Sequence, residues 1–204
     1  MPLLTELSIP GRAGAVNMSV QTELGPIGTT VNDNPTPPEL LATPPQMLLL
    51  GLGNDILTDD AVGLLVVREL RPRLAGLPSI DIRETTEMGL ALLDFITGYR
   101  IVVIVDSIQT GNAPPGFLHE LDPSALNQLT GRTPHFLGVT ETLALGRQLG
   151  LAMPAQVKIF AIEVQDPFTL GTSLTPTLRS ALPGITERVA AALWGLAQSA
   201  AAQP

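Results

Sequence analysis

The stretch "LLLGLGNDILTDDAVGLLVVREL", residues 48–70, joins an apolar run to a helical pattern through two glycines and two adjacent acids. The apolar run, with Met47 before it, is typical of a buried strand over 47–53, since strands covered on both faces read as continuous apolar segments. Thr58 has a side chain suited to a helix N-cap, and apolar residues then recur at helical spacing as far as Leu74. We therefore expect a strand, a tight turn and a helix.

The rest of the chain continues this alternation of short apolar runs and helical patterns. Further strands are expected over 80–85, 100–107, 116–121 and 155–164, and the short third one suits a sheet edge. Helices are expected over 88–98, 138–150 and 175–202, with Pro183 and Gly184 bending or breaking the last one early. This order predicts an α/β fold: a single three-layer domain with a twisted, mostly parallel sheet and helices on both faces.

Residues 1–46 differ in kind from the rest of the chain. They mix Pro, Gly, Thr and Asn without a sustained helical or strand period, so they bury too little apolar surface to offset the entropy of ordering them. We expect residues 1–46 to be a flexible extension and residues 47–204 to be the folded domain. A truncation that starts at Met47 should fold and stay active.

Composition excludes several classes of protein. The formal charge of −8 and the lack of a basic cluster argue against a nucleic-acid partner. The absence of cysteine excludes disulfides, cysteine-based zinc sites and a cysteine nucleophile. No apolar stretch approaches the ~18–20 residues that span a bilayer, and no secretory signal is visible. We expect a monomeric cytoplasmic protein with no membrane partner.

Acidic residues follow three of the predicted strands. In open α/β sheets ligands bind beyond the carboxyl ends of the strands, where Asp59, Asp60, Glu84, Glu87 and Asp106 are expected. An acid in a first helical turn also stabilises the helix by roughly 0.3–1 kcal/mol. A structural role therefore competes with a chemical one for the first pair. Asp106 ends a run of five β-branched residues, where structural roles are fewer.

Only two histidines are available for a site. His119 falls inside a short strand pattern, which favours a surface or half-buried position, whereas His135 in "TPHFLG" is either a turn residue or part of the site. Asp60, Asp106 and His135 would together offer two carboxylates and an imidazole, which suits nickel or zinc. Such sets also arise by chance.

Other functional readings fit less well. A dinucleotide-binding loop needs a third glycine where Ile56 stands, and no Gly-Lys-Ser/Thr follows for a P-loop. The glycines are better explained by a tight turn and a close backbone approach. No Gly-x-Ser-x-Gly elbow is present, and the Asp-Thr/Ser-Gly motif of aspartic proteases is missing.

Four segments together resemble the hydrogenase maturation endopeptidases, which trim the large subunit of nickel–iron hydrogenases. They are "LLLGLGNDILTDDAVGLLVVREL", "IVVIVDSIQTG", "TPHFLGVTETL" and "AIEVQDPFTLGTSLTPTL". The resemblance covers roughly residues 47–195. It implies a metal-contacting trio that maps onto Asp60, Asp106 and His135; the first is often Glu in relatives. Glu84 is the nearest match to an Asp-Gly-Gly-Thr-like segment, and its role stays open.

The resemblance also implies a substrate and a reaction. The enzyme would recognise nickel already placed in the hydrogenase large-subunit precursor and then remove a short C-terminal extension. The nickel would arrive with the substrate, so no permanent cofactor is expected. The alternative is a non-catalytic nickel-binding chaperone of the same subunit. We expect Asp106 and His135 to lie in exposed loops, and Asp59→Asn to matter much less for processing than Asp60→Asn.

Overall fold

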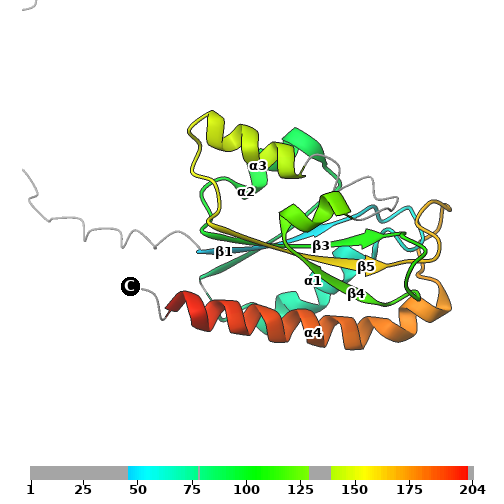
Figure 1. The fold of residues 1–204 in the computed structure, drawn as a ribbon. Coiled ribbons are helices and arrows are strands. Elements are labelled where there is room, and N and C mark those ends of the chain that lie inside the picture. Colours follow the sequence, from blue (N-terminus) through cyan, green and yellow to red (C-terminus); the bar gives the residue numbers. More distant parts are fainter. Residues whose placement is uncertain (1–45, 78, 129–138, 202–204) are drawn as a thin grey trace, which may run out of the picture. The chain divides into compact units, whose positions relative to one another are not determined.

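The computed structural model describes residues 46–77, 79–128 and 139–201. These residues form one five-stranded sheet in the order β2-β1-β3-β5-β4 (Figure 1). The strands are β1 (Met47–Leu52), β2 (Ile80–Thr85), β3 (Ile101–Ile108), β4 (Leu118–Leu121) and β5 (Gln156–Glu163). Four of them run parallel, and β4 pairs antiparallel with β5 at the edge. The predicted mostly parallel sheet and its short edge strand are confirmed.

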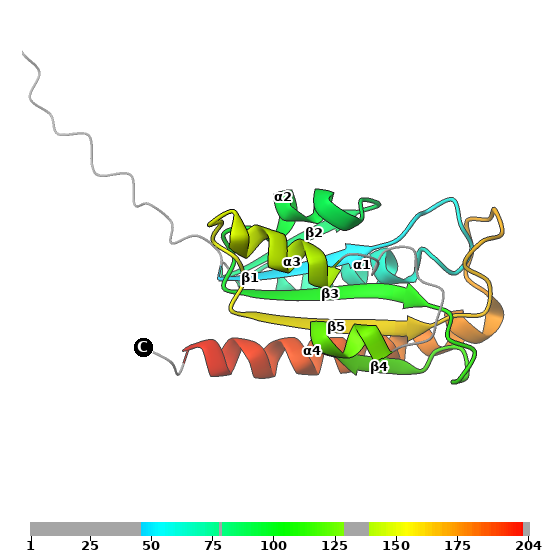
Figure 2. The same cartoon turned by 45° about the horizontal axis from the view of Figure 1, so that its top comes forward.

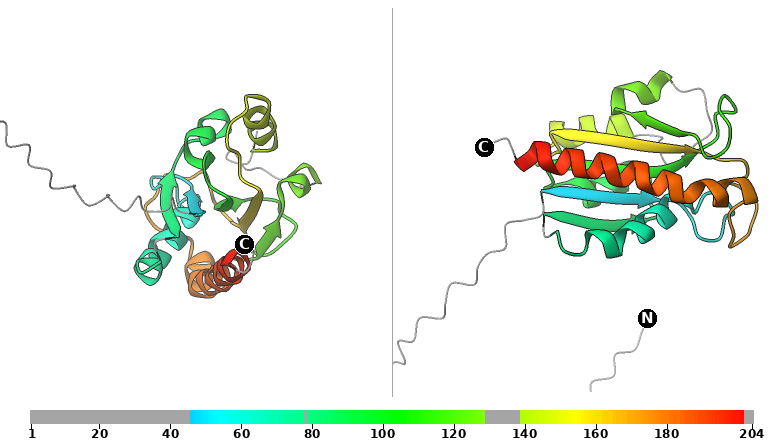
Figure 3. Two further views of the ribbon diagram at one scale, coloured as in Figure 1. Left: turned by 90° about the vertical axis from the view of Figure 1, so that its left-hand side faces the viewer. Right: turned by 90° about the horizontal axis from the view of Figure 1, so that it is seen from below.

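Helices cover both faces of the sheet, as predicted. One face carries α1 (Val62–Leu74) and α4 (Pro176–Ala201), which lie side by side in Figure 3. The other carries η1 (Gly89–Leu92), α2 (Leu93–Ile96) and α3 (Val139–Gln148), and η2 (Pro123–Gln128) follows β4. The protein is therefore a three-layer α/β domain over these residues.

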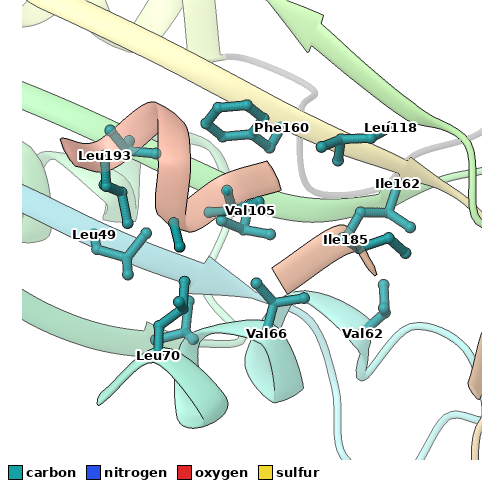
Figure 4. Close-up of a cluster of buried hydrophobic side chains, with 14 of the residues drawn as sticks. Leu49, Val62, Val66, Leu70, Val105, Leu118, Phe160, Ile162, Ile185 and Leu193 are labelled. Atoms are coloured by element: carbon teal, nitrogen blue, oxygen red, sulfur yellow. The ribbon is translucent and has the colours of Figure 1, made fainter. Parts of the chain in front are cut away.

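Each face of the sheet has its own apolar core. On the α1 and α4 side, alternate residues of β1, β3 and β5 meet the buried stripes of both helices; Figure 4 labels Leu49, Val105, Phe160, Val66 and Leu193 among them. The opposite core uses the intervening strand residues with α2 and α3. Because both faces are covered, every residue of β1 and of β3 is buried. This burial explains why residues 47–52 and 101–105 read as continuous apolar runs.

Two local predictions were wrong. The last helix runs unbroken through Pro183: a proline costs about 3 kcal/mol inside a helix, but Leu178, Ile185 and Leu193 are buried against the sheet on either side of it. Thr58 is not an N-cap, because α1 begins at Val62 and the Thr58 hydroxyl donates to the carbonyl of Thr169 at 2.8 Å. In both places contacts with distant residues decide the structure.

The connections that follow β1 and β2 place a topological switch point between β1 and β3 at the carboxyl end of the sheet. From β1 the chain crosses one face through α1 to reach β2, and it then returns over the other face through α2 to β3, on the opposite side of β1. Ligands of open α/β sheets bind at such a switch point. Figure 2 shows the loops after β1 (cyan) and β5 (orange) meeting at this end.

Residues 1–45 lie outside the described residues, so their predicted flexibility stays a prediction. Gln46 is described, and its carbonyl accepts hydrogen bonds from the N–H groups of Arg100 and Ile101 at 3.1 and 3.0 Å. The part of the chain that the structure describes therefore begins one residue before the predicted boundary at Met47. Over the described ranges, no helix is long and apolar enough to cross a membrane.

Candidate active site

The turn between β1 and α1 is unusually close-packed. Gly53 has φ 145°, and a Cβ there would lie 2.2 Å from the carbonyl oxygen of Asp60. A Cβ on Gly63 would lie 2.3 Å from the oxygen of Leu52 and 2.5 Å from that of Val105. The first turn of α1 therefore rests directly on the backbones of β1 and β3. The expected role of the two glycines is confirmed: Gly53 forms the tight turn, and a Cβ on Gly51 would lie only 2.9 Å from the carbonyl oxygen of Gly63. Gly63 itself makes a further close approach that no sequence pattern indicated.

Asp59 is a structural anchor of the site. It is fully buried, and its Oδ2 accepts hydrogen bonds from the N–H groups of Gln165 and Asp166 at 3.2 and 3.0 Å. The N–H of Thr175 donates to Oδ1 at 2.7 Å, and the Thr175 hydroxyl donates to Oδ2 at 3.0 Å. The expected contribution of Asp59 to a helix start is wrong, because its carboxylate holds the loop between β5 and α4 instead.

Asp60 and Asp106 both contact Ser107. The Ser107 hydroxyl donates to Oδ1 of Asp60 at 2.8 Å, while the Ser107 N–H donates to Oδ1 of Asp106 at 2.7 Å. All three residues are at most 2% exposed. The structure thus brings the two predicted carboxylates to one residue of β3, at the switch point of the sheet.

Asp106 does not lie in an exposed loop, as was expected. It is the sixth residue of β3, is paired in register with Ala161 of β5, and is fully buried. The strand extends two residues beyond it because β5 continues beside it. Substitution of Asp106 is therefore expected to lower the stability of the fold.

His135 lies outside the described residues, so the position of the predicted imidazole stays a prediction. Within residues 46–77, 79–128 and 139–201, no three His, Cys, Asp or Glu side chains are placed to hold a metal ion. The described part of the site therefore offers two carboxylates held through one serine.

Glu84 belongs to a surface ion-pair network. Its carboxylate contacts Arg68 at 2.7 Å and Arg71 at 2.9 Å, and Arg68 also contacts Asp55 at 2.8 Å. The hydrogen bond from Arg68 lowers the pKa of Asp55, and the same bond raises the pKa of Arg68. The carboxylate of Glu84 therefore forms ion pairs with two arginines beside the candidate site.

A further buried carboxylate, which no sequence pattern indicated, fixes the loop after β3. Glu163 at the end of β5 is 1% exposed. It accepts hydrogen bonds from the N–H groups of Thr110 and Gly111 and from the Thr110 hydroxyl, all at 2.8 Å. His119 Nε2 lies 3.0 Å from its Oε2. The expected half-buried strand position of His119 is confirmed; no local pattern indicated its partner, which is 44 residues away.

A pocket of about 260 Å³ opens beside Asp60. Its lining residues come from the loops after β1, β2 and β5: Asn54, Leu57, Asp60, Thr86, Met88, Pro167 and Phe168. Asp60 is the one charged residue among them. The pocket lies where the fold predicts a ligand.

Comparison with known proteins decides the family. The family model described as "Hydrogenase maturation protease" matches residues 64–192, which is more than half of the chain. The chain belongs to the hydrogenase maturation protease family. As a member of this family it is a hydrolase of the endopeptidase class, and the resemblance seen in its sequence motifs is confirmed.

Individual family members match most of the chain. Hydrogenase 2 maturation protease of Escherichia coli is 28% identical over 150 residues, covering 72% of this chain and 90% of the relative. The structure of the hydrogenase maturating endopeptidase HybD from E. coli matches with a TM-score of 0.61 and 26% identity, over 74% of this chain and 93% of that one. A maturation protease from Thermococcus kodakarensis, 24% identical with a TM-score of 0.54, supports the fold; the match covers 72% and 98% of the two chains.

Proposed function

We propose that this protease removes the C-terminal extension of a nickel-loaded [NiFe] hydrogenase large-subunit precursor, and that Asp60, Asp106 and His135 recognise the bound nickel. The observation that carries the proposal is the pair of buried carboxylates that contact Ser107 at the switch point. The relatives to which this chain is similar are named as hydrogenase maturation proteases, which supports the proposed reaction.

The chemistry of the proposed trio suits a metal that the substrate delivers. Carboxylate oxygens and a neutral imidazole are ligands that nickel accepts. Three protein ligands leave positions for the groups that already hold the metal in the precursor. Ser107 has a positioning role, since its hydroxyl orients Asp60 while its N–H orients Asp106.

Peptide-bond cleavage requires an activated water and a polarised carbonyl. Nickel held between substrate and trio would supply the polarisation. A carboxylate oxygen of Asp60 or Asp106 that does not contact the metal would accept the proton of the attacking water as a general base, and would return it to the leaving amine nitrogen as the C–N bond breaks. Asp60 lines the pocket and is therefore the better placed of the two to reach water.

Processing of the nickel-loaded precursor tests this function. The purified enzyme should release the C-terminal peptide, detected by mass spectrometry, and should leave nickel-free precursor uncut. Asp60→Asn, Asp106→Asn and His135→Ala should each abolish release, whereas Asp94→Asn, which alters an exposed acid of α2, should not. A stable, uncut complex with nickel-loaded precursor would instead support the non-catalytic chaperone. Full processing by any of the three site variants would remove that residue from the proposed trio.

A further inference from the structure

Backbone hydrogen bonds join the loop after β1 to the loop after β5. The N–H of Thr58 donates to the carbonyl of Thr169 at 2.9 Å, and that of Gly171 donates to the carbonyl of Ile56 at 3.0 Å. Leu57 and Leu170 form an isolated antiparallel bridge between these bonds. The two loops, coloured cyan and orange in Figure 2, are thus one ordered unit at the carboxyl end of the sheet.

This unit leaves large apolar side chains in water. Ile56, Phe168 and Leu170 are 59%, 52% and 76% exposed, and Met88 on the loop after β2 is 43% exposed. Scattered apolar residues are normal on a surface, but these four lie on the three loops that form the pocket, and Met88 and Phe168 line it. We call Ile56, Met88, Phe168 and Leu170 the apolar rim. The backbone hydrogen bonds between the loops after β1 and β5 already hold most of the apolar rim in place. A partner that binds the apolar rim therefore loses little binding free energy to the ordering of these loops.

The pocket behind the apolar rim is suited to a side chain. At about 260 Å³ it falls below the roughly 300–1,000 Å³ of typical small-molecule sites. Leu57, Met88, Pro167 and Phe168 give it apolar walls. A protein segment with an apolar side chain fits this space better than a cofactor does.

Charge also restricts what the apolar rim can bind. Neither Lys nor Arg is among the residues that line the pocket, and Arg68 and Arg71 nearby are engaged by Asp55 and Glu84. The site therefore favours an apolar segment that lies next to a positive group, such as a metal ion, at Asp60. A second copy of the chain is disfavoured, because each copy carries a formal charge of −8.

We propose that the apolar rim is the docking surface for an apolar segment of the large-subunit precursor, with one apolar side chain of that segment in the pocket beside Asp60. The inference rests on the proposed function for the identity of the partner. It adds that recognition depends on apolar contacts as well as on nickel, and that these contacts come from the loops after β1, β2 and β5.

Direct binding separates this inference from the proposed cleavage. Nickel-loaded precursor, immobilised through its N-terminus, is titrated with the wild-type enzyme and with Leu170→Ser and Phe168→Ser, while mass spectrometry follows its C-terminus. Each substitution should weaken Kd about tenfold, the effect of one buried apolar side chain, and should raise KM more than it lowers kcat. Leu149→Ser is the matched control, since Leu149 is 62% exposed and follows α3 at the other end of the sheet.

Each outcome of the titration decides the proposal. Kd values for both rim variants within twofold of the wild type would overturn it, as would a wild-type enzyme that does not bind the precursor. Selective weakening by the rim variants without any cleavage would support the docking surface and refute the proposed removal of the C-terminal extension from this precursor. Light scattering measures the oligomeric state of the wild type and of Leu170→Ser. A wild-type dimer that Leu170→Ser converts to a monomer would show that the apolar rim binds a second copy of the chain, and would overturn the proposal.

Discussion

Substitution of Asp59 should weaken the fold more than its place beside a helix implies. Its buried carboxylate accepts four hydrogen bonds from Gln165, Asp166 and Thr175. Asp59→Asn keeps the shape but turns one oxygen into a donor. At Oδ2 the new amide would face the N–H groups of Gln165 and Asp166, and at Oδ1 it would face that of Thr175. Either orientation sets a donor against a donor.

The magnitude follows from these contacts. A buried donor left without its acceptor costs ~1–3 kcal/mol, and the remaining bonds weaken when the negative charge is lost. We expect Asp59→Asn to lower the free energy of unfolding by about 2–4 kcal/mol, a large part of the roughly 5–15 kcal/mol that is typical of a domain. With an m-value near 2 kcal/mol/M, the urea midpoint should fall by roughly 1–2 M.

Urea unfolding measures this change through Trp194, the single tryptophan of the chain. Asp94→Asn is the control, since its side chain is exposed, and it should shift stability by less than about 0.5 kcal/mol. If Asp59→Asn also changed the free energy of unfolding by less than about 0.5 kcal/mol, Asp59 would not be an anchor of the loop between β5 and α4. Where the variant is still folded, it should process precursor better than Asp60→Asn does; equal losses would mean that the wrong acid of the pair is assigned to nickel.

Three further changes test other parts of the structure. Gly63→Ala should destabilise the protein by about 3 kcal/mol or prevent folding, because its Cβ would meet two backbone oxygens at 2.3 and 2.5 Å; Gly76→Ala, with open space around it, is the control, and equal stability of the two variants would contradict the close approach. Glu163→Gln should speed amide hydrogen exchange at Thr110 and Gly111, because both N–H groups donate to its carboxylate; unchanged exchange would remove Glu163 as the anchor of that loop. Burial and the hydrogen bond to Asp81 raise the pKa of Tyr99 from 10 to about 12, so its contribution to stability is complete below pH 10 and is lost as pH rises towards 12. The wild type should therefore lose stability relative to Tyr99→Phe over that range, and parallel unfolding curves would rule this out.

The sequence predicted what short-range patterns control. The continuous apolar runs at 47–52 and 101–105 identify strands buried on both faces, and the order of strands and helices then predicts a mostly parallel sheet. From that topology the carboxyl ends of β1 and β3 follow as the candidate site, and Asp60 and Asp106 both lie there, in contact with Ser107.

The sequence could not predict contacts made over long separations. Asp59 bonds to Thr175, 116 residues away, and Glu163 bonds to Thr110, 53 residues away. Neither partner is signalled by periodicity or by capping chemistry, because the pairing depends on how the loops meet in three dimensions. For the same reason Asp59 resembled a favourable helix start, and Pro183 resembled the end of a helix.

The adjacency of Asp59 and Asp60 fixes the distance between the proposed metal-contacting acid and the loop that carries Phe168 and Leu170. One acid holds the loop that carries Phe168 and Leu170, and the other faces the pocket, with their Cα atoms only about 3.8 Å apart across a single peptide unit. Phe168 and Leu170 of the apolar rim are therefore tied through Asp59 to the position of Asp60. A protease built in this way would select precursors by the number of residues between the bound metal and the apolar side chain that enters the pocket. Lengthening that interval by one residue would be a more severe change than exchanging one apolar residue for another.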